Sequence, residues 1–370
     1  MSLAFSVDFV HRVVFTRGLF RLDSPVLIEA LCGGSKRLVA FIDDGVANTH
    51  ADLAARLGQR LAAAPDAPRL IASYVIPGGE ACKLDRSVVD QVLAAVDEHH
   101  LCRRSWIVAI GGGAMLDAVG YGAAVAHRGV RLVRIPTTVL AQDDAGMGVK
   151  NGINRFGKKN FEGCFAVPWA VLNDADFLAT LPERFWTGGF SEAVKIALLK
   201  DAAFFDDLER GAAAVRRRDL EVALPLIERC ARLHLDHIAR AGDPFELAQA
   251  RPLDYGHWSA HKLEQLTHHR LSHGEAVAIG VALDTEYSAQ VGSLDRREAD
   301  RVLRCLQSMG LPIWHESLED PRLLAGLEEF REHLGGSLCV TLLNGIGHSY
   351  ECDSIDTSVV RSASDRLRTL

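Results

Sequence analysis

Several side chains in the second half of the chain have types and spacings that suit a metal site. Glu192 and Lys195 stand three residues apart in GGFSEAVK, and His257 and His261 stand four apart in LDYGHWSAH, so each pair shares one helix face. His273 follows in SHGEAVAIG. Imidazole and carboxylate are ligands of zinc-like ions, and a catalytic site needs three of them plus an open position. Each histidine taken alone is more often a core or surface residue than a metal ligand.

A second group of residues could bind a phosphate-bearing cofactor. In WIVAIGGGAMLDAVGYGAA, a strand-like run is followed by Gly111, Gly112 and Gly113 and then by a helical pattern. These glycines leave backbone N–H groups open at a helix N-terminus, where pyrophosphate binds. A tight strand-to-helix turn is the alternative explanation. Asp117 in the next turn suits either a ribose contact or a charge that favours the helix start.

Polar residues also follow three other strand-like runs, LVAFI, RLIASYV and RLVRI. The residues after these runs are, in order, Asp43 and Asp44, Glu80 and Lys83, and Thr137 and Thr138. Open parallel sheets bind ligands outside the carboxyl ends of their strands, so this shared position favours a dinucleotide pocket over a set of unrelated turns. The segment FLATLP at 177–182, which contains Thr180, belongs to the same picture.

The stretch AQDDAGMGVKNGINRFGKKNFEG, residues 141–163, interleaves polar residues with five glycines and has no apolar periodicity. We therefore expect a loop and not a core element. Long polar loops inside compact domains are usually functional, which favours a binding loop over a merely solvated one.

The elements that must position these residues follow from hydrophobic periodicity. Strands are expected at 4–15, 38–42, 69–76, 106–110 and 131–135, with a helix at 86–100. Their alternation predicts a Rossmann-like, mostly parallel sheet with helices on both faces. Helical patterns then follow at 183–200, 219–240, 257–267, 274–291, 295–309 and 320–333. The sequence thus predicts an α/β domain at 1–180 and a mainly helical domain at 181–370, divided near Leu181 and Pro182.

The composition excludes several classes of protein. The chain has 370 residues, 48% of them hydrophobic and 24% charged, which is usual for a globular protein of about two domains. A net charge of −7 argues against nucleic-acid binding. No run reaches the ~18 apolar residues of a membrane span, and Asp8, His11 and Arg12 interrupt any signal peptide, so we expect a cytoplasmic protein without membrane partners. The eight cysteines form no CxxC pair and are expected to be reduced and mostly buried.

Together these motifs resemble the sugar phosphate cyclase superfamily, whose best-known member is 3-dehydroquinate synthase. The segments GGGAMLD, PTT, AQDDAGMGVKNGIN, GKKNFEG, TLPERF, FSEAVK, YGHWSAH and HGEAVAIG occur in the order typical of that family. The resemblance implies an NAD-binding α/β domain, a helical metal- and substrate-binding domain, and a homodimer. It also implies bound NAD and a divalent metal, usually zinc, with cobalt as the alternative.

The resemblance further implies roles for individual residues. The expected metal ligands are Glu192, His257 and His273. The positions that match residues holding the substrate phosphate or acting near the reacting carbons are Lys150, Asn160, Lys195 and His261. Asp144 matches a contact to a substrate hydroxyl near the metal, and Arg128 matches a phosphate-binding arginine that reaches into the partner subunit. The cofactor contacts implied are Glu80, Lys83, Gly112, Gly113, Asp117, Thr137, Thr138 and Lys159, to which the motifs above add Asp43, Gly111 and Thr180.

Some positions depart from the pattern of dehydroquinate synthases. In dehydroquinate synthases the residue three positions before the first metal histidine resembles an asparagine, whereas this chain has Asp254 there. The cations that recognise the substrate carboxylate there align with Asp236, Ala250 and the segment EFREHLGG, near Arg331 or Glu332. Each charge-assisted bond to a carboxylate contributes about 1.5–3 kcal/mol, so the resemblance implies a substrate without a carboxylate unless Arg251 or Arg331 turns inward.

The substrate implied is a sugar phosphate, chiefly sedoheptulose 7-phosphate, with glucose 6-phosphate as another choice. An aspartate at position 254 resembles the enzymes that act on sedoheptulose 7-phosphate, and this resemblance implies that Asp254 belongs to the catalytic site. The presence of His261 favours a 2-epi-valiolone product over 2-epi-5-epi-valiolone. The implied enzyme is a lyase that eliminates phosphate, closes a carbon ring by aldol addition and regenerates its NAD. The alternatives are 3-dehydroquinate synthase, a metal-dependent polyol dehydrogenase and a non-catalytic NAD-binding protein.

Overall fold

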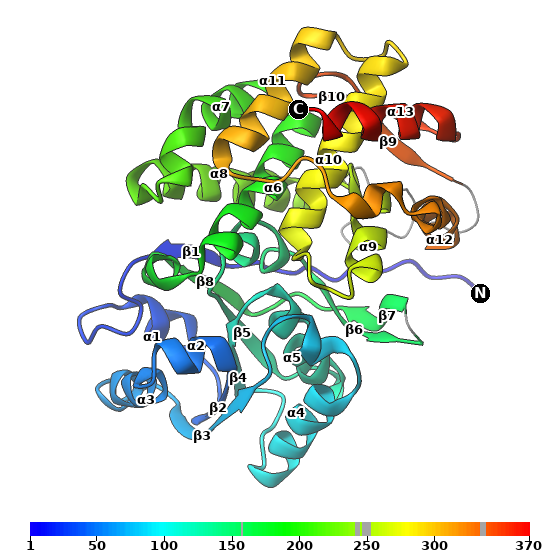
Figure 1. The fold of residues 1–370 in the computed structure, drawn as a ribbon. Helices are drawn as coiled ribbons and strands as arrows, with labels where there is room; N and C mark the ends of the chain where they lie inside the picture. The colour runs from blue at the N-terminus through cyan, green and yellow to red at the C-terminus, as the bar shows by residue number, and fades with distance from the viewer. Residues whose placement is uncertain (157, 241–244, 246–252, 334–337) are drawn as a thin grey trace. The chain divides into compact units, whose positions relative to one another are not determined.

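The computed structural model describes residues 1–156, 158–240, 245, 253–333 and 338–370 (Figure 1). The chain divides into two units, Met1–Thr180 and Leu181–Leu370. Among the described helices, none combines the length and apolar character that a membrane span requires.

The first unit is built on a six-stranded sheet with the strand order β1-β8-β5-β4-β2-β3, in which every neighbouring pair is parallel. The strands are β1 (Val13–Thr16), β2 (Arg37–Asp43), β3 (Arg69–Ile76), β4 (Trp106–Gly111), β5 (Arg131–Pro136) and β8 (Ala170–Asp174). β4 is apolar and buried along its whole length, and β5 is buried along nearly all of its length, as expected for strands enclosed on both faces.

Helices cover both faces of this sheet (Figure 1). Along β2, Val39 and Phe41 pack into one core with α4 and α5, whereas Leu38, Ala40 and Ile42 pack into a second core on the opposite face. The helices are α1 (Val26–Ala30), α2 (Asp44–Thr49), α3 (Leu53–Ala62), α4 (Ser87–Glu98) and α5 (Gly113–Val125). The alternation of side chains along the strand thus produces two cores, and the predicted α/β class is confirmed.

The stretch at 141–163 is not the loop that we predicted. It begins with a π-helical turn at Ala141–Ala145 and continues as an antiparallel hairpin of β6 (Lys150–Arg155) and β7 (Lys158–Phe165). Gln142 and Asn151 are buried, so part of this stretch does belong to the core. The glycines act as close-approach positions here, because a Cβ on Gly152 would lie 2.7 Å from the carbonyl oxygen of Glu162 on the facing strand.

The strand predicted at 4–15 is also wrong over most of its length. Only Val13–Thr16 pairs with β8, although the apolar alternation extends back to Leu3. β8 begins at Ala170, opposite the start of β1, and therefore offers no partner to the residues before it. Phe5 and Phe9 are accordingly exposed.

The second unit is mainly helical, as predicted. Its helices are α6 (Glu183–Lys200), α7 (Ala202–Arg216), α8 (Leu220–Arg240), α9 (His257–Leu266), α10 (His273–Gln290), α11 (Arg296–Met309), α12 (Ala325–His333) and α13 (Thr357–Arg368). α6 and α10 are buried over most of their turns and pack against each other. Both are enclosed helices, buried on nearly all sides over most of their length.

Two further expectations change. The antiparallel pair β9 (Val340–Gly345) and β10 (His348–Cys352) is an element that the sequence did not predict. All eight cysteines are free, as expected, but they are not mostly buried. Only Cys82, Cys230 and Cys305 are buried, whereas Cys32 and Cys102 are exposed.

Candidate active site

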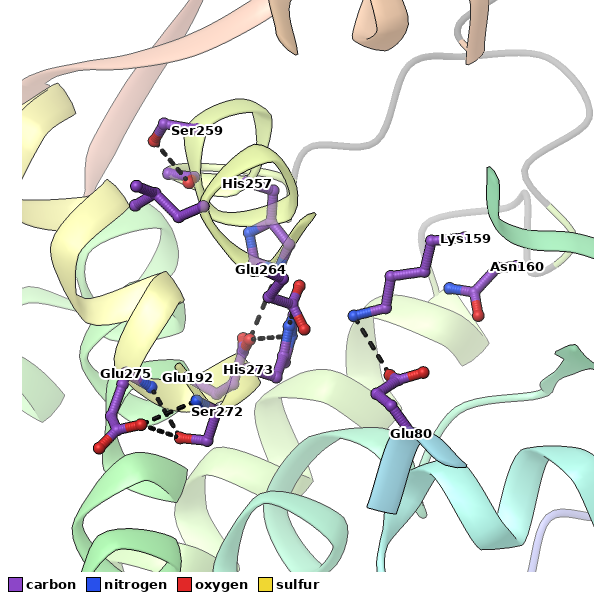
Figure 2. Close-up of polar contacts among 12 residues, drawn as sticks. Glu80, Lys159, Asn160, Glu192, His257, Ser259, Glu264, Ser272, His273 and Glu275 are labelled. Carbon is purple, nitrogen blue, oxygen red and sulfur yellow. Dashed lines mark hydrogen bonds and ion pairs between the residues drawn. The ribbon is translucent and has the colours of Figure 1, made fainter. Parts of the chain in front are cut away.

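The three expected metal ligands come together in the second unit, from the ends and middle of three helices. Glu192 lies in the middle of α6, His257 begins α9 and His273 begins α10. The Nε2 atoms of His257 and His273 each lie 3.5 Å from Oε1 of Glu192 (Figure 2). One ligand atom from each residue lies within 4.8 Å of the other two, so the group is able to hold one metal ion.

Close backbone contacts fix the helices that carry these ligands. Gly256, which precedes His257, has a φ of +76°, and a Cβ there would lie 2.6 Å from the amide nitrogen of Val281 on α10. Gly274 abuts Gly188 so tightly that a Cβ would overlap the Gly188 carbonyl. α9 and α6 therefore meet α10 at points where only glycine fits. This places His257, Glu192 and the first turn of α10 beside one another.

A capping box sets the start of α10 at His273. The Ser272 side chain accepts a hydrogen bond from the Glu275 amide, and the Glu275 carboxylate accepts one from the Ser272 amide at 2.8 Å (Figure 2). Arg184 on α6 donates to the same carboxylate at 2.6 Å.

The other ring nitrogen of each histidine has an acceptor that sets its tautomer. Nδ1 of His257 lies 3.0 Å from the carbonyl oxygen of Tyr255, and Nδ1 of His273 lies 3.2 Å from Oε2 of Glu264 (Figure 2). Both contacts require an N–H at Nδ1, which leaves the Nε2 lone pairs directed toward Glu192. Sequence reasoning missed Glu264. Its signal was a carboxylate seven residues after His257, two turns along the same face of α9.

The electrostatics of this cluster suit a cation. Glu192 is 1% exposed and Lys195 is 4% exposed, and the Lys195 ammonium lies against the Glu192 carboxylate. Burial alone would raise the pKa of Glu192, but the Lys195 ammonium holds it well below its usual value. Among the described residues, Oε1 of Glu192 has no hydrogen-bond partner. A buried carboxylate oxygen in that state, facing two imidazole lone pairs, is what a divalent ion would satisfy.

His261 lies beside the three ligands. Its ring centroid is 5.4 Å from that of His257 and 6.0 Å from that of His273. With Glu264 and His273 it forms a second group close enough to hold an ion, which shares His273 with the first. Asp254 is partly buried, and its carbonyl oxygen accepts a hydrogen bond from the His257 amide at 3.0 Å.

Asp284 on α10 binds the residues on both sides of His257, one through its backbone and one through its side chain. Its carboxylate accepts hydrogen bonds from the Gly256 amide at 3.0 Å and from Nε1 of Trp258 at 2.9 Å. Burial raises the pKa of Asp284 to about 7. Sequence reasoning missed this residue, because nothing in its spacing separates it from the apolar face of α10.

Four of the expected cofactor residues form one polar cluster in the first unit. Lys83 is 2% exposed and donates to Oδ2 of Asp117 at 2.9 Å and to Oδ1 of Asn160 at 2.5 Å. The Lys159 ammonium lies 3.3 Å from Oε1 of Glu80 (Figure 2). Helix α5, the 3-10 helix at Gly79–Lys83 and the hairpin thus contribute to one polar cluster.

Asn154 joins this cluster although we assigned it no role from the sequence. Its Nδ2 donates to Glu80 at 3.2 Å, and its Oδ1 accepts from the Asn160 amide at 2.8 Å. Asn160 has a φ of +53°, so this hydrogen bond stabilises a backbone conformation that few residue types adopt readily. The polar composition of the hairpin was the available signal.

The three glycines lie where the predicted strand meets the predicted helix. Gly111 ends β4, and Gly112 is the N-cap of α5 in an extended conformation without a side-chain cap. The Thr137 amide donates to the Gly111 carbonyl at 3.0 Å, and Oγ1 of Thr138 accepts from the Ala141 amide. A Cβ on Gly113 would crowd that of Ala145. Because Gly112 has no side chain, the backbone N–H groups in the first turn of α5 receive no hydrogen bond from a capping side chain.

Asp43, which the sequence predicts as a cofactor residue, makes structural contacts within the first unit. Its Oδ1 caps α2 by accepting from the Gly45 amide at 2.9 Å, and burial raises its pKa. It also lies against Gly111, since a Cβ there would be 2.9 Å from the Asp43 Cβ. Thr180 is exposed, and its Oγ1 lies 3.0 Å from Nε2 of His50.

The other three expected substrate residues of the first unit lie on three different elements. Asp144 is in the π-helical turn, and Lys150 is exposed at the start of β6. Arg128 is exposed in a short 3-10 turn with a φ of +63°.

The residues expected to bear on carboxylate recognition are only partly described. Asp236 pairs with Arg240 at 3.3 Å on α8, and Arg331 pairs with Glu328 at 2.6 Å on α12. The Arg331 guanidinium is therefore already bound to a carboxylate of its own helix. Ala250, Arg251 and the side chain of Glu332 lie outside the described residues.

Known proteins and family models are similar to this chain along nearly its whole length. The N-terminal family model of 3-dehydroquinate synthase matches residues 73–187 and the C-terminal model matches 189–330. A 2-epi-5-epi-valiolone synthase from Streptomyces glaucescens is 32% identical over 96% of this chain and 91% of its own length. A 3-dehydroquinate synthase from Halorhodospira halophila is 34% identical over 88% of both.

A solved structure is similar over the whole fold. ValA, a 2-epi-5-epi-valiolone synthase from Streptomyces hygroscopicus with NAD+ and Zn2+ bound, has a TM-score of 0.90 and 30% identity, covering 100% of this chain and 99% of its own. The two family models match in sequence order, and relatives above 30% identity cover almost the full length of the chain. These matches determine the family. The chain belongs to the 3-dehydroquinate synthase family of sugar phosphate cyclases.

Proposed function

We propose that this chain is an NAD- and divalent-metal-dependent sugar phosphate cyclase that converts sedoheptulose 7-phosphate into a C7 cyclitol of the 2-epi-valiolone type. The reaction eliminates phosphate and closes the ring by an intramolecular aldol addition. The observation that carries the proposal is the convergence of His257 and His273 on the buried oxygen of Glu192, in a chain whose relatives include 2-epi-5-epi-valiolone synthases.

The second unit would hold the metal and the reacting end of the substrate. Glu192, His257 and His273 fit zinc or cobalt, which supplies Lewis acidity toward a hydroxyl or carbonyl oxygen when bound. Lys195 places a positive charge beside the ligands and offsets the negative charge of a phosphorylated substrate. His261, next to both ligand histidines, is suited to hold or transfer a proton at the substrate.

The first unit would bind NAD, which supplies a reversible hydride acceptor. Gly111, Gly112 and Gly113 present the uncapped start of α5, where backbone N–H groups and the helix dipole favour pyrophosphate. The side chains proposed to contact the rest of the cofactor are Asp43, Glu80, Lys83, Asp117, Thr137, Thr138, Lys159 and Thr180. Among them, the hydrogen bond from Lys83 to Asp117 and the ion pair of Lys159 with Glu80 preorganise part of the surface on which a dinucleotide would lie.

The substrate phosphate and hydroxyls would be held largely by the hairpin region. Lys150 and Asn160 offer a cation and an amide, and Asp144 offers an acceptor for a sugar hydroxyl. Arg128 is exposed and is proposed to reach the phosphate in a partner subunit, which makes the functional enzyme a homodimer.

The preference for a neutral sugar phosphate rests on the positions that differ from dehydroquinate synthases. Asp254, beside His257, accepts hydrogen bonds from extra hydroxyls but repels a carboxylate. Arg331 is engaged by Glu328, and Asp236 adds a second negative charge in the same unit.

The second candidate is 3-dehydroquinate synthase itself. It is favoured by the family models and by relatives with that name at 34–35% identity, slightly higher than the 32% identity to 2-epi-5-epi-valiolone synthase. The two candidates share the metal, the cofactor and the phosphate. They differ in the substrate, which carries a carboxylate in dehydroquinate synthase and extra hydroxyls in the sedoheptulose 7-phosphate cyclase.

A substrate panel separates these candidates. The purified protein is incubated with NAD and zinc or cobalt, and phosphate release is measured with sedoheptulose 7-phosphate, the carboxylate-bearing precursor of 3-dehydroquinate, and glucose 6-phosphate. We expect kcat/KM for sedoheptulose 7-phosphate to exceed that for the precursor by about a hundredfold or more, because two charge-assisted contacts are missing. Asp254→Asn should reduce the ratio of kcat/KM for sedoheptulose 7-phosphate to kcat/KM for the carboxylate-bearing precursor. Equal values on both substrates would favour dehydroquinate synthase, and release from none would refute cyclase activity.

A further inference from the structure

A buried arginine beneath the hairpin binds backbone instead of a carboxylate. Arg134, in the middle of β5, is 0% exposed. Its Nη1 donates to the carbonyls of Gly146 at 3.2 Å and Gly148 at 2.7 Å. Its Nη2 donates to the carbonyl of Lys150 at 3.2 Å and to Oδ1 of Asn151 at 2.7 Å. These four acceptors are neutral oxygens, all within one short segment, 146–151.

Placing a guanidinium here is unfavourable unless the segment needs it. Burial lowers the pKa of Arg134, which shows that its surroundings disfavour the charge. An apolar side chain would fill the same strand position without desolvating a cation, as its neighbours Val133 and Ile135 do. What Arg134 adds is a planar fork that fixes several carbonyls at once.

Asn151 and Gly120 complete this support. The Asn151 amide group donates to the carbonyls of Val149 at 3.2 Å and Ala166 at 3.1 Å, which ties both ends of the hairpin together. Gly120, on α5, lies so close that a Cβ there would overlap Oδ1 of Asn151. The helix that begins at the three glycines is therefore packed directly on the oxygen to which Arg134 donates.

We propose that Arg134 is a positioning residue for Lys150. Held by Asn151 and by the close packing of Gly120, its guanidinium fixes the backbone of 146–151 in the conformation that presents the Lys150 side chain to the substrate. The link to substrate rests on the proposed function of Lys150. The link to the backbone does not, because it follows from hydrogen bonds to the segment itself.

Hydrogen exchange tests the backbone link without substrate. The amides of Gly146, Met147 and Gly148 are bonded to the carbonyls of Ala141 and Asp144, so their protection reports the order of the segment. In Arg134→Met we expect exchange at 146–151 to be at least about tenfold faster, since several hydrogen bonds to a charged donor are lost. Arg131→Met is the matched control. It lies on the same strand but stacks on Trp106 and Trp169, and should leave 146–151 unchanged.

A double-mutant cycle tests the link to Lys150. Arg134→Met should lower kcat/KM for the sugar phosphate by roughly 10- to 100-fold, and by no more than Lys150→Met does, because a displaced group loses at most its own contribution. If Arg134 acts through Lys150, the same change in a Lys150→Met background should have little further effect. Arg134→Lys, which keeps the charge but loses the fork, should fall between the wild type and Arg134→Met. Should Arg134→Met fail to fold, Asn151→Ala gives the same test, with a smaller expected loss.

The outcomes separate the two claims. Unchanged exchange at 146–151 in Arg134→Met, or losses that add fully in the double variant, would overturn the positioning role. If the wild type releases no phosphate from any sugar phosphate, the proposed function fails, while faster exchange in Arg134→Met would still support the backbone link.

Discussion

The metal-ligand cluster of the second unit and the hairpin of the first unit are built in opposite ways. Glu192, His257 and His273 lie on helices, mostly buried, with their orientation set by short contacts to Tyr255 and Glu264. The polar side chains of the hairpin are more exposed, and their backbone is held from below by a buried arginine. A metal ion needs fixed ligand atoms, whereas a flexible sugar phosphate needs several cations and amides that a bound substrate can order.

The largest expected effect is the loss of a ligand from the rigid cluster. His257→Ala should remove the metal and lower phosphate release by about a thousandfold or more, because the charge stabilisation by the ion is lost. Metal content by mass spectrometry and phosphate release measure the two effects. His268→Ala, an exposed histidine at the end of α9, is the control and should retain both. Full metal content in His257→Ala would remove it from the ligand set.

Loss of a cation from the hairpin should leave the metal in place. Lys150→Met is expected to lower kcat/KM by roughly 10- to 100-fold, the size of one charge-assisted contact to phosphate, with unchanged metal content. Lys158→Met, on the same hairpin at an exposed position, is the comparison. If Lys150→Met also loses the metal, the two regions are not independent and the contrast between them fails.

The support of the ligands can be tested apart from the ligands themselves. Glu264→Gln keeps the shape of the side chain but weakens the acceptor for Nδ1 of His273. We expect metal affinity to fall about 10- to 100-fold, as is usual for the partners of ligating histidines. A chelator competition assay measures the affinity directly. Glu329→Gln, which removes a carboxylate that pairs with Lys262 at the surface, should bind metal like the wild type.

The smallest expected effect concerns Asp284. Its pKa is raised to about 7 in the folded chain, so the folded state retains a proton that the unfolded state has already released above its ordinary pKa near 4. The contribution of Asp284 to stability is therefore greatest at low pH and decreases as the pH rises toward 7.

Asp284→Asn removes this dependence. The Tm of the variant, measured relative to the wild type, should rise by roughly 2–4 °C between pH 5 and pH 8 as the wild type loses its advantage. Thermal unfolding of both proteins in the same buffers measures the difference. A constant difference across this range would show that Asp284 is ionised throughout.

The same contrast explains which parts could be predicted from the sequence. The apolar runs of β2 to β5 and the helical patterns of α6, α9 and α10 carry their own periodicity, and ligand spacing such as GHWSAH is local to one helix. The prediction of a loop was wrong because glycines such as Gly152 and Gly163 are typical of turns. In the structure these glycines instead allow the backbones of the two hairpin strands to lie close together. The roles of Arg134 and Asp284 could not be predicted from the sequence, because both residues bind partners that are distant in the sequence. Asp284 also lies within the apolar pattern of α10.

The most direct test of the proposed cyclase is the balance between NAD and phosphate in a reaction with sedoheptulose 7-phosphate. The wild-type protein, loaded with zinc or cobalt and with NAD equimolar to enzyme, is mixed with excess substrate while phosphate release and absorbance at 340 nm, the usual signal of NADH, are followed together. We expect many phosphates released per NAD and no accumulation of NADH, because the cofactor is regenerated in each turnover. One NADH formed for each substrate consumed would contradict the cyclase and assign the chain to the dehydrogenases.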